Sequence, residues 1–135
     1  VQCGGQQRRS IVGNGAMTDI ERLRPEIEKA LKYSLNTHTF DDVVELVQQA
    51  KMQLWPGKSS VIVTEIVLYP QHKCLNYFIA AGVMDELALM TPMIESWGKG
   101  LGCTRVSLAG RKGWQRTFLA QRGYTPQWWI MSKEL

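Results

Sequence analysis

The chain has 135 residues and a formal net charge of +4, with 44% of its residues hydrophobic and 21% charged. This length accommodates one domain with a single core, and the composition is ordinary for a soluble globular protein. No apolar run approaches the ~20 residues of a membrane-spanning helix, and no hydrophobic segment typical of a secretory signal opens the chain. The three cysteines, Cys3, Cys74 and Cys103, lack metal-ligand spacing and fit a reducing cytoplasm.

The opening residues 1–16 are rich in Gln, Gly, Arg and Ser and show no periodicity. They are interpreted as a flexible extension or an artificial tail, which leaves residues 17–135 as a single domain. Thr18, followed three residues later by a glutamate, has the pattern of a capping box and predicts a helix from Asp19 to Tyr33. Thr39 is the predicted N-cap of a second helix.

Three strands are predicted next, because short runs rich in β-branched and aromatic residues are separated by tight turns. They lie at Met52–Trp55, Ser59–Tyr69 and Cys74–Ala81 and form an antiparallel meander. Helical residues follow from Asp85, and the pair Thr91-Pro92 has the pattern of a new helix start within them.

The last third of the chain is the most informative part. It predicts a strand, a helix and a closing strand, at Arg105–Ala109, Gly113–Arg122 and Trp128–Glu134. The helix ends in the pair Gly123-Tyr124. The predicted order of the whole chain is therefore α-α-β-β-β-α-β-α-β, without internal repeats.

This order, with a helix that ends in a Gly-aromatic pair before the last strand, resembles the GCN5-related N-acetyltransferase (GNAT) superfamily over nearly all of residues 18–135. The resemblance implies an α/β (α+β) fold, in which helices flank a mixed, mostly antiparallel central sheet. It also implies N-acyl transfer from acetyl-CoA as the default chemistry.

In this superfamily a loop of the pattern Gln/Arg-x-x-Gly-x-Gly/Ala leads from a strand into a helix, and its N–H groups cradle the pyrophosphate of acetyl-CoA. The matching segment here, residues 80–87, has one glycine and places Asp85 and Glu86 at the phosphate position. Leu119 stands where many members have a tyrosine that protonates the leaving thiolate, and Tyr124 occupies a packing position. We therefore expect acetyl-CoA to bind weakly or not at all, and we assign no cofactor.

Several stretches are also similar to a group of small uncharacterised proteins of tailed phages and prophages. They are residues 38–43, 54–56, 63–66, 110–114 and 133–135. This resemblance implies an origin in a phage or mobile element, and a location in the host cytoplasm or in the phage particle. It implies no established activity.

Glu65 is the most specific single candidate for a catalytic residue. Along the long predicted strand it alternates to the same face as Val61, Val63 and Val67. A carboxylate among valines is either a desolvated general base that takes a proton from an amine, or a structural group in an ion pair or at an exposed edge.

The last third also holds a run of bases with no acid among its members. Arg111 and Lys112 stand between Gly110 and Gly113 at the start of a predicted helix, where cations oppose the helix dipole by ~0.3–1 kcal/mol. An anion bound at that turn would favour them, so these four residues are the candidate anion- or cofactor-binding group. A solvated turn with screened charges is the alternative.

His38 lies in the polar loop between the first two helices, near the place where this superfamily binds substrate, although a lone histidine in a loop is also consistent with no role. Trp128 and Trp129 are adjacent on the closing strand and point to opposite faces, so one of them is expected to be exposed. An exposed tryptophan on an edge strand favours self-association or binding of a protein partner.

Two functions are consistent with these features. The first, favoured by the altered phosphate loop and the missing tyrosine, is a degenerate acetyltransferase-fold protein that acts by binding a partner. The second is an active N-acyltransferase that uses acetyl-CoA or another anionic cofactor, with Glu65 as general base. The bases are not interleaved with exposed aromatic residues as in an RNA-binding module, which argues against nucleic acid, and no membrane partner is expected.

Overall fold

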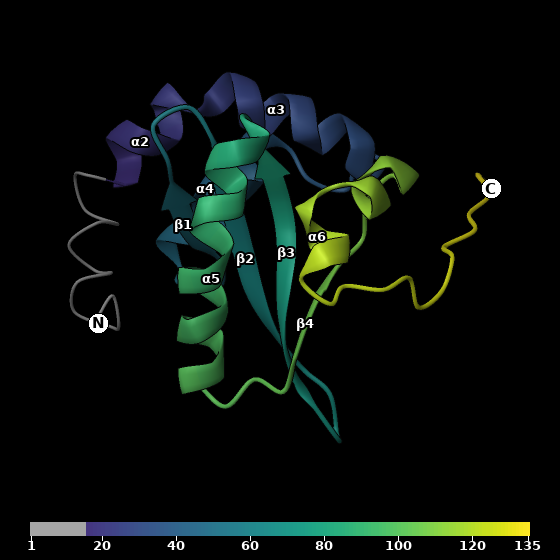
Figure 1. Ribbon diagram of the computed structural model, residues 1–135. Coiled ribbons are helices and arrows are strands. Elements are labelled where there is room, and N and C mark those ends of the chain that lie inside the picture. Colours follow the sequence, from purple (N-terminus) through teal and green to yellow (C-terminus); the bar gives the residue numbers. More distant parts are fainter. Residues whose placement is uncertain (1–15) are drawn as a thin grey trace.

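A four-stranded sheet forms the centre of the protein, in the order β1-β2-β3-β4 (Figure 1). The computed structural model describes residues 16–135, so the predicted extension at residues 1–16 lies outside the described residues except for Ala16. The strands are β1 (Gln53–Pro56), β2 (Val61–Leu68), β3 (Lys73–Ala81) and β4 (Arg105–Leu108). The first three form the predicted antiparallel meander, and β4 lies parallel to β3. The predicted mixed, mostly antiparallel sheet is thus confirmed.

Helices cover both faces of this sheet (Figure 1). One face carries α2 (Ala16–Arg22), α3 (Arg24–Leu31), a 3₁₀ turn η2 (Lys32–Ser34) and α4 (Phe40–Gln48). The other face carries α5 (Met84–Gly100) and, beside it, the 3₁₀ helix η3 (Lys112–Arg116) and α6 (Phe118–Gln121). Within residues 16–135, no helix combines the length and the apolar character that a bilayer crossing requires.

Each face has its own hydrophobic core. On the α3/α4 face, the helices pack against the side chains of β2 and β3 that point toward them. The buried residues of this core include Ile27, Val43, Val61, Val63 and Ile79. The α5 face is centred on the opposite side of the same strands, and its buried members are Ile62, Leu75, Tyr77, Leu87 and Ile94. The strict alternation of side chains along β2 therefore places successive residues in two different cores.

The first predicted helix is divided in two, because the chain breaks at Leu23, whose φ of −95° and ψ of 6° are not helical. Pro25 follows in the first turn of α3, where its missing N–H is tolerated. Thr18 lies inside α2, so its prediction as an N-cap is wrong. The prediction for Thr39 is confirmed: its hydroxyl accepts the N–H of Asp42, and the Asp42 carboxylate accepts the N–H of Thr39.

A β-bulge interrupts β3. Val63 of β2 pairs with Ile79 and the next residue, Thr64, pairs with Tyr77, so Phe78 is an extra residue on β3. The parallel pairing with β4 stops at the same level, because Tyr77 pairs with Leu108, where β4 ends. Beyond this point β3 runs on to Ala81 without β4 beside it. The bulge and the end of β4 thus mark the place where these two strands part.

The predicted helix start at Thr91-Pro92 is wrong, since α5 runs unbroken through Pro92. A proline inside a helix cannot donate to the carbonyl four residues earlier, which here belongs to Ala88. That carbonyl instead accepts a hydrogen bond from Arg122 Nη1 at 2.6 Å, and the same nitrogen donates to Thr91 Oγ1 at 2.9 Å. The guanidinium, which comes from the end of α6, therefore replaces the lost N–H and ties α6 to α5.

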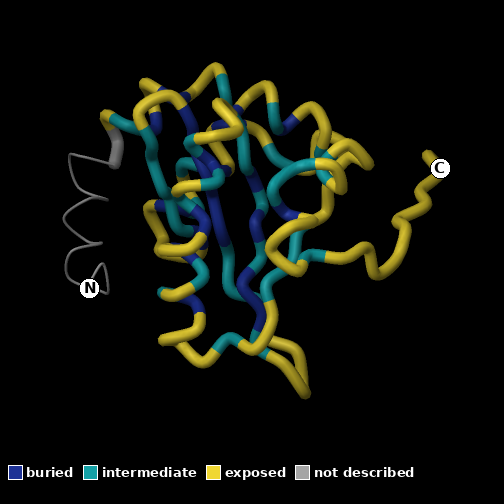
Figure 2. The backbone as a smooth tube through the Cα atoms, viewed as in Figure 1, coloured by how far each residue is buried: buried dark blue, intermediate teal, exposed yellow. Residues whose placement is uncertain are grey.

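The last third of the chain departs most from the prediction. The helix predicted at Gly113–Arg122 is two short pieces, η3 and α6. The closing strand predicted at Trp128–Glu134 does not form, and residues 125–135 have no regular secondary structure. This segment leaves the domain and is exposed along its length (Figure 2). A strand requires a neighbour for its backbone hydrogen bonds, and no strand of the described sheet pairs with this segment.

The role of Arg122 predicts a coupling with Pro92. Arg122→Met should lower the free energy of unfolding by about 1 kcal/mol, because the Ala88 carbonyl loses its closer donor and keeps only the Thr91 hydroxyl at 3.4 Å. In a Pro92→Ala background the helix supplies an N–H to that carbonyl, so the same substitution should cost about half as much or less. Chemical denaturation of the four proteins measures this cycle. Arg116→Met, at an exposed position of η3, is the matched control, and an equal cost of Arg122→Met in both backgrounds would contradict the assignment.

Candidate functional site

The connection from β3 into α5, where the superfamily resemblance places the cofactor phosphates, has only two residues, Gly82 and Val83. The Val83 N–H donates to the Ser60 hydroxyl at 2.8 Å. Gly82 has a φ of +125°, and a Cβ there would lie 2.4 Å from Ser60 Oγ and 2.5 Å from Ser60 Cα. Only glycine fits this contact. The connection is therefore packed directly against the start of β2.

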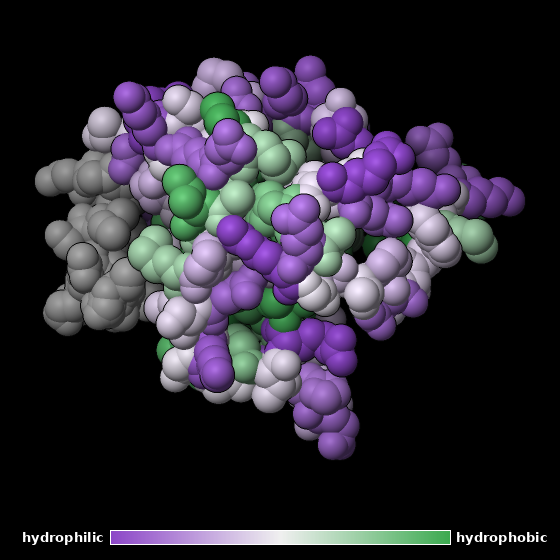
Figure 3. Space-filling view, viewed as in Figure 1, coloured by the Kyte–Doolittle hydropathy of each residue, from purple (hydrophilic) through white to green (hydrophobic). Residues whose placement is uncertain are grey.

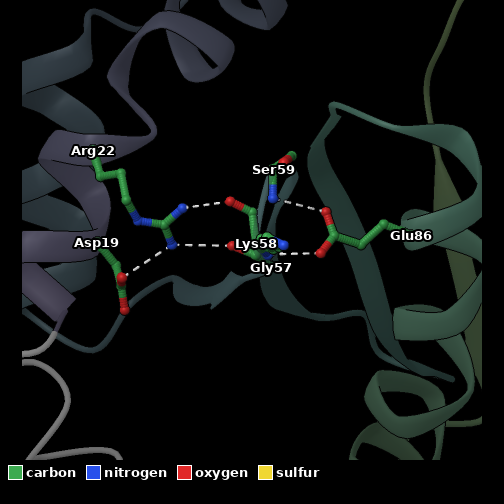
Figure 4. Close-up of polar contacts among 6 residues, drawn as sticks. All are labelled: Asp19, Arg22, Gly57, Lys58, Ser59 and Glu86. Atoms are coloured by element: carbon green, nitrogen blue, oxygen red, sulfur yellow. Dashed lines mark hydrogen bonds and ion pairs between the residues drawn. The ribbon is translucent and has the colours of Figure 1, made fainter.

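The Glu86 carboxylate lies in the first turn of α5 and binds the turn between β1 and β2 (Figure 4). Its two oxygens accept the backbone N–H groups of Lys58 and Ser59 at 2.6 and 2.9 Å. Hydrogen bonding from the Ser60 side chain and from these two N–H groups lowers the pKa of Glu86. Gly57 permits this approach, because a Cβ there would lie 2.8 Å from the carboxylate.

Arg22 of α2 holds the same turn from the opposite side (Figure 4). Its guanidinium donates to the carbonyls of Lys58 and Gly57 at 2.7 and 3.0 Å, and it pairs with Asp19 at 3.1 Å. The carbonyls of the turn thus bind a cation from α2 while its N–H groups bind an anion from α5. We call this arrangement, made by Arg22, Gly57, Lys58, Ser59 and Glu86, the turn clamp.

The turn clamp changes the expected role of the two acids. Asp85 and Glu86 were expected to occupy the phosphate position as repelling charges. Asp85 is exposed, whereas Glu86 turns away to the β1–β2 turn and acts as an anion bound by backbone N–H groups. The chain itself therefore supplies the carboxylate that is bound at this end of α5.

Glu86→Gln should make stability less dependent on pH. Stability from a carboxylate with a lowered folded-state pKa is present above the ordinary value of ~4.3 and is lost as pH falls through the folded-state pKa. The variant should therefore unfold at lower urea concentration than the wild type near neutral pH, and the two midpoints should converge in acid. Denaturation series between about pH 3 and pH 7 measure this. Glu134→Gln, in the exposed segment after α6, is the control. A constant gap between wild type and Glu86→Gln at all pH values would contradict the assignment.

A second polar group lies on the α5 side of the sheet, beside the bulge. Glu95 of α5 accepts hydrogen bonds from the hydroxyls of Tyr124 and Tyr77, the latter at 3.4 Å. Burial raises the pKa of both tyrosines, and the Glu95 hydrogen bond adds to the increase at Tyr124. Both phenols are therefore held protonated as donors to one carboxylate. Glu95, Tyr77 and Tyr124 are named the tyrosine cluster.

The tyrosine cluster is the group that sequence reasoning missed. Tyr124 was predicted to be a packing residue, but its hydroxyl is bound by Glu95. The available signal was Glu95 itself, the only charged residue of α5 between Glu86 and Lys99. An acid isolated within an apolar helix indicates a buried polar partner. Chemically, the cluster can fix the position of α6 and hold a proton donor near the place where β3 and β4 part.

Glu65 lies half-buried on β2 and makes a hydrogen bond that sequence could not specify. Its carboxylate accepts Asn76 Nδ2 at 2.8 Å, and Asn76 Oδ1 accepts the Ser107 hydroxyl at 3.3 Å. The three side chains thus form a chain across β2, β3 and β4. This gives Glu65 a structural partner, and the arrangement holds the sheet together at the level just before β3 and β4 separate.

The predicted anion-binding turn has a different geometry from the one assumed. Gly110 leaves room for the Trp114 indole, since a Cβ there would lie 2.8 Å from it. Arg111 stacks over the Tyr33 ring at 3.9 Å and Lys112 over the Trp129 ring at 4.6 Å. The helix that follows is 3₁₀ and five residues long, so it has little dipole to oppose them. Both cations lie over aromatic rings, which is a second way to stabilise them, and anion binding at this turn stays a prediction.

His38 lies at the edge of a hollow between α3 and α4. Its ring contacts the bulged residue Phe78 edge-on, with centroids 4.7 Å apart, and its Nδ1 lies 2.8 Å from Thr37 Oγ1. The hollow has a volume of about 680 Å³, and its lining includes Lys29, Lys32 and His38. Among the predicted site residues, His38 thus contacts Phe78, Arg111 lies over Tyr33, and Glu65 belongs to the hydrogen-bond chain across the sheet, and no contact described for residues 16–135 joins the three.

Trp128 and Trp129 are both exposed, at 76% and 64%, so the expectation that only one would be exposed is wrong. Ile130 and Met131 extend the apolar surface to four consecutive exposed residues. Trp129 contacts Lys112, and the segment makes no strand. The prediction assumed a strand with one buried and one exposed face. Because the segment has no strand of the described sheet beside it to pair with, it forms no strand and neither tryptophan is directed into the core.

Comparisons with known proteins agree on the fold. The BH1408 protein from Bacillus halodurans, as a tetramutant, has a TM-score of 0.63 at 17% identity, over 90% of this chain and 95% of that chain. A putative acetyl transferase from Pyrococcus furiosus has a TM-score of 0.60 at 14% identity, over 86% and 93%. A ribosomal-protein-alanine N-acetyltransferase from Brucella melitensis has a TM-score of 0.61 at 9% identity, over 87% and 94%. No family model matches the sequence, and no curated protein matches it.

These similarities establish a GNAT-like fold for this chain, as the resemblance of its element order implied. The identities are low, so the comparisons concern the arrangement of helices and strands and not the reaction.

Proposed function

We propose that this protein uses the GNAT-like fold to bind a protein partner, without binding acetyl-CoA in the manner of that superfamily. The observation that carries the proposal is the closed connection between β3 and α5. A phosphate cradle needs free N–H groups and space at the start of the helix. Here the Val83 N–H is bound by Ser60, Gly82 packs against Ser60, and the first turn of α5 carries two acids.

The missing tyrosine at Leu119 supports the same reading. Leu119 is buried and contributes to packing, so the α6 position that carries a proton donor in many superfamily members is apolar here. The hydroxyl of Tyr124, five residues later, is already bound by Glu95. No free donor is therefore offered to a leaving thiolate from either residue.

Acetyl-CoA should bind with a dissociation constant no tighter than about 1 mM, which corresponds to about −4 kcal/mol. Titration calorimetry measures this directly. The double variant Asp85→Asn/Glu86→Gln distinguishes exclusion of the cofactor by charge from exclusion by the closed connection. If charge repulsion alone excluded acetyl-CoA, the variant would bind it more tightly than the wild type. We expect no gain, because the connection itself is closed. A micromolar dissociation constant for the wild type would contradict the proposal.

The partner surface that we propose is the exposed segment Trp128–Met131. Tryptophan contributes strongly to interfaces, and four consecutive exposed apolar residues are costly to leave in water. The segment is unpaired in the described sheet, so its backbone N–H and C=O groups are also available to a strand of a partner. Its position away from the domain leaves it accessible (Figure 2).

Trp128→Ser/Trp129→Ser should therefore reduce capture of a partner at least about tenfold while leaving the thermal unfolding midpoint unchanged, because neither indole is buried. Cross-linking in the native host extract, quantified against the wild type, measures the capture. Leu68→Ser, at an equally exposed apolar position in the β2–β3 hairpin, is the control. Identical capture by the wild type and the tryptophan variant would count against this surface.

An active N-acyltransferase is the second candidate, and the tyrosine cluster beside the β3 bulge is the observation in its favour. Bulges are frequent next to active sites, and the cluster places a protonated phenol there. In this reading Glu65 is the general base, although its carboxylate is bound by Asn76. Acetyl transfer to amines that is abolished by Tyr124→Phe or Glu65→Gln would favour it.

We also propose an origin in a phage or mobile element, with the protein in the host cytoplasm or in the phage particle. The support is the similarity of five short sequence stretches, from residues 38–43 to residues 133–135. Detection of the chain in purified particles by mass spectrometry would distinguish the two locations.

A further inference from the structure

Helix α5 has an outer face that nothing in the described structure covers. Its inner face is buried through Leu87, Thr91, Ile94 and Gly98. On the opposite side, Leu89 and Met93 are 80% and 61% exposed. In the space-filling view, hydrophobic side chains lie along the upper part of α5, on the face turned to the viewer (Figure 3). Apolar residues on the outer as well as the inner face of a helix are typical of a helix that is covered on both faces.

Five of the exposed residues of α5 follow a regular seam. They are Asp85, Leu89, Pro92, Ser96 and Lys99, at spacings of four, three, four and three, and the exposed Met93 lies beside them. This is the spacing with which one helix packs along another. Between the two terminal charges the seam is apolar or small. We call these five residues the outer seam.

The two charges at the ends of the outer seam have opposite signs. Asp85 stands in the first turn and Lys99 in the last turn of α5. They are fourteen residues apart, which is about 21 Å along a helix. No hydrogen bond or ion pair to either side chain is found within residues 16–135, so both charges are available to another molecule.

We infer that α5 pairs with α5 of a second copy, antiparallel, about a two-fold axis near Pro92. In a two-fold interface, when residue i of one copy contacts residue j of the other, residue j of the first copy also contacts residue i of the second. Residue 92 is midway between residues 85 and 99, so an antiparallel pair places Asp85 of each copy opposite Lys99 of the other. The same arrangement brings the apolar centre, with Leu89 and Met93, against its own copy. A parallel pair would place like charges together at both ends.

This inference is independent of the proposed partner surface. The outer seam lies on α5, whereas the segment Trp128–Met131 follows α6 and leaves the domain (Figure 1). The helix dipole also favours an acid near the start and a base near the end of α5, even in a monomer. Exchanging the charges of Asp85 and Lys99 distinguishes the helix dipole from helix pairing. Only in a pair does the effect of a charge at residue 85 depend on the charge at residue 99.

The test is sedimentation equilibrium of the full chain and four variants. The wild type should dimerise, and Leu89→Lys should remove the dimer, since it places two lysines in the apolar centre. Asp85→Lys alone and Lys99→Asp alone each place like charges together at both ends and should raise the dissociation constant about tenfold or more at low salt. The double exchange Asp85→Lys/Lys99→Asp should restore it to near the wild-type value.

Leu68→Lys, at an exposed leucine on the β2–β3 hairpin, is the matched control and should dimerise normally. Circular dichroism of each variant verifies that α5 is folded, and the charge effects should shrink in high salt. A wild type that stays monomeric at millimolar concentration would overturn the inference. So would a dimer that survives Leu89→Lys but is lost in Trp128→Ser/Trp129→Ser, or a double exchange that fails to restore dimerisation.

Discussion

The position of α5 depends on how the turn between β1 and β2 is bound. That turn presents carbonyls to one side and N–H groups to the other, and each set meets a charge: Arg22 from α2 and Glu86 from α5. Charge-assisted hydrogen bonds to backbone groups are stronger than neutral ones, and both charges come from helices on opposite faces of the sheet. The turn clamp therefore links the two helical layers through a single loop. Next to the turn clamp, Gly82 and Val83 pack against Ser60 at the start of α5.

Further along α5, two more interactions determine what the helix presents. Pro92 frees the Ala88 carbonyl, which Arg122 binds, and the Glu95 carboxylate binds the hydroxyls of Tyr77 and Tyr124. Both interactions use groups from the end of α6 or from the residues after it. The polar groups of the middle of α5 are thus satisfied toward the sheet and α6. The outer seam carries charge only at its ends, Asp85 and Lys99, which is compatible with a two-fold pair of helices.

These features describe a GNAT-like fold in which the connection from β3 into α5 is organised around interactions within the chain. The anion at the start of α5 is the carboxylate of Glu86, and the donor hydroxyl beside the bulge is bound to Glu95. A fold supports many functions, and the site decides among them. Two surfaces stay uncovered in the described structure, the segment Trp128–Met131 and the outer seam of α5, and both are proposed as binding surfaces.

The sequence by itself determined the architecture. The α-α-β-β-β-α-β core, the Thr39 cap and the antiparallel meander follow from periodicity, capping and turn residues, which act within a few positions along the chain. The single glycine and the two acids of residues 80–87 are also read directly from the sequence, because composition is local information.

Only the tertiary structure decided the rest, because those outcomes depend on partners distant in sequence. Pro92 does not start a new helix because Arg122, thirty residues later, satisfies the freed carbonyl. Arg111 and Lys112 stack on Tyr33 and Trp129, rings that no local pattern connects to them. Glu65 meets Asn76 only through strand register. The strand at Trp128–Glu134 has the right residues but no neighbour, and a strand is stable only when its backbone is paired.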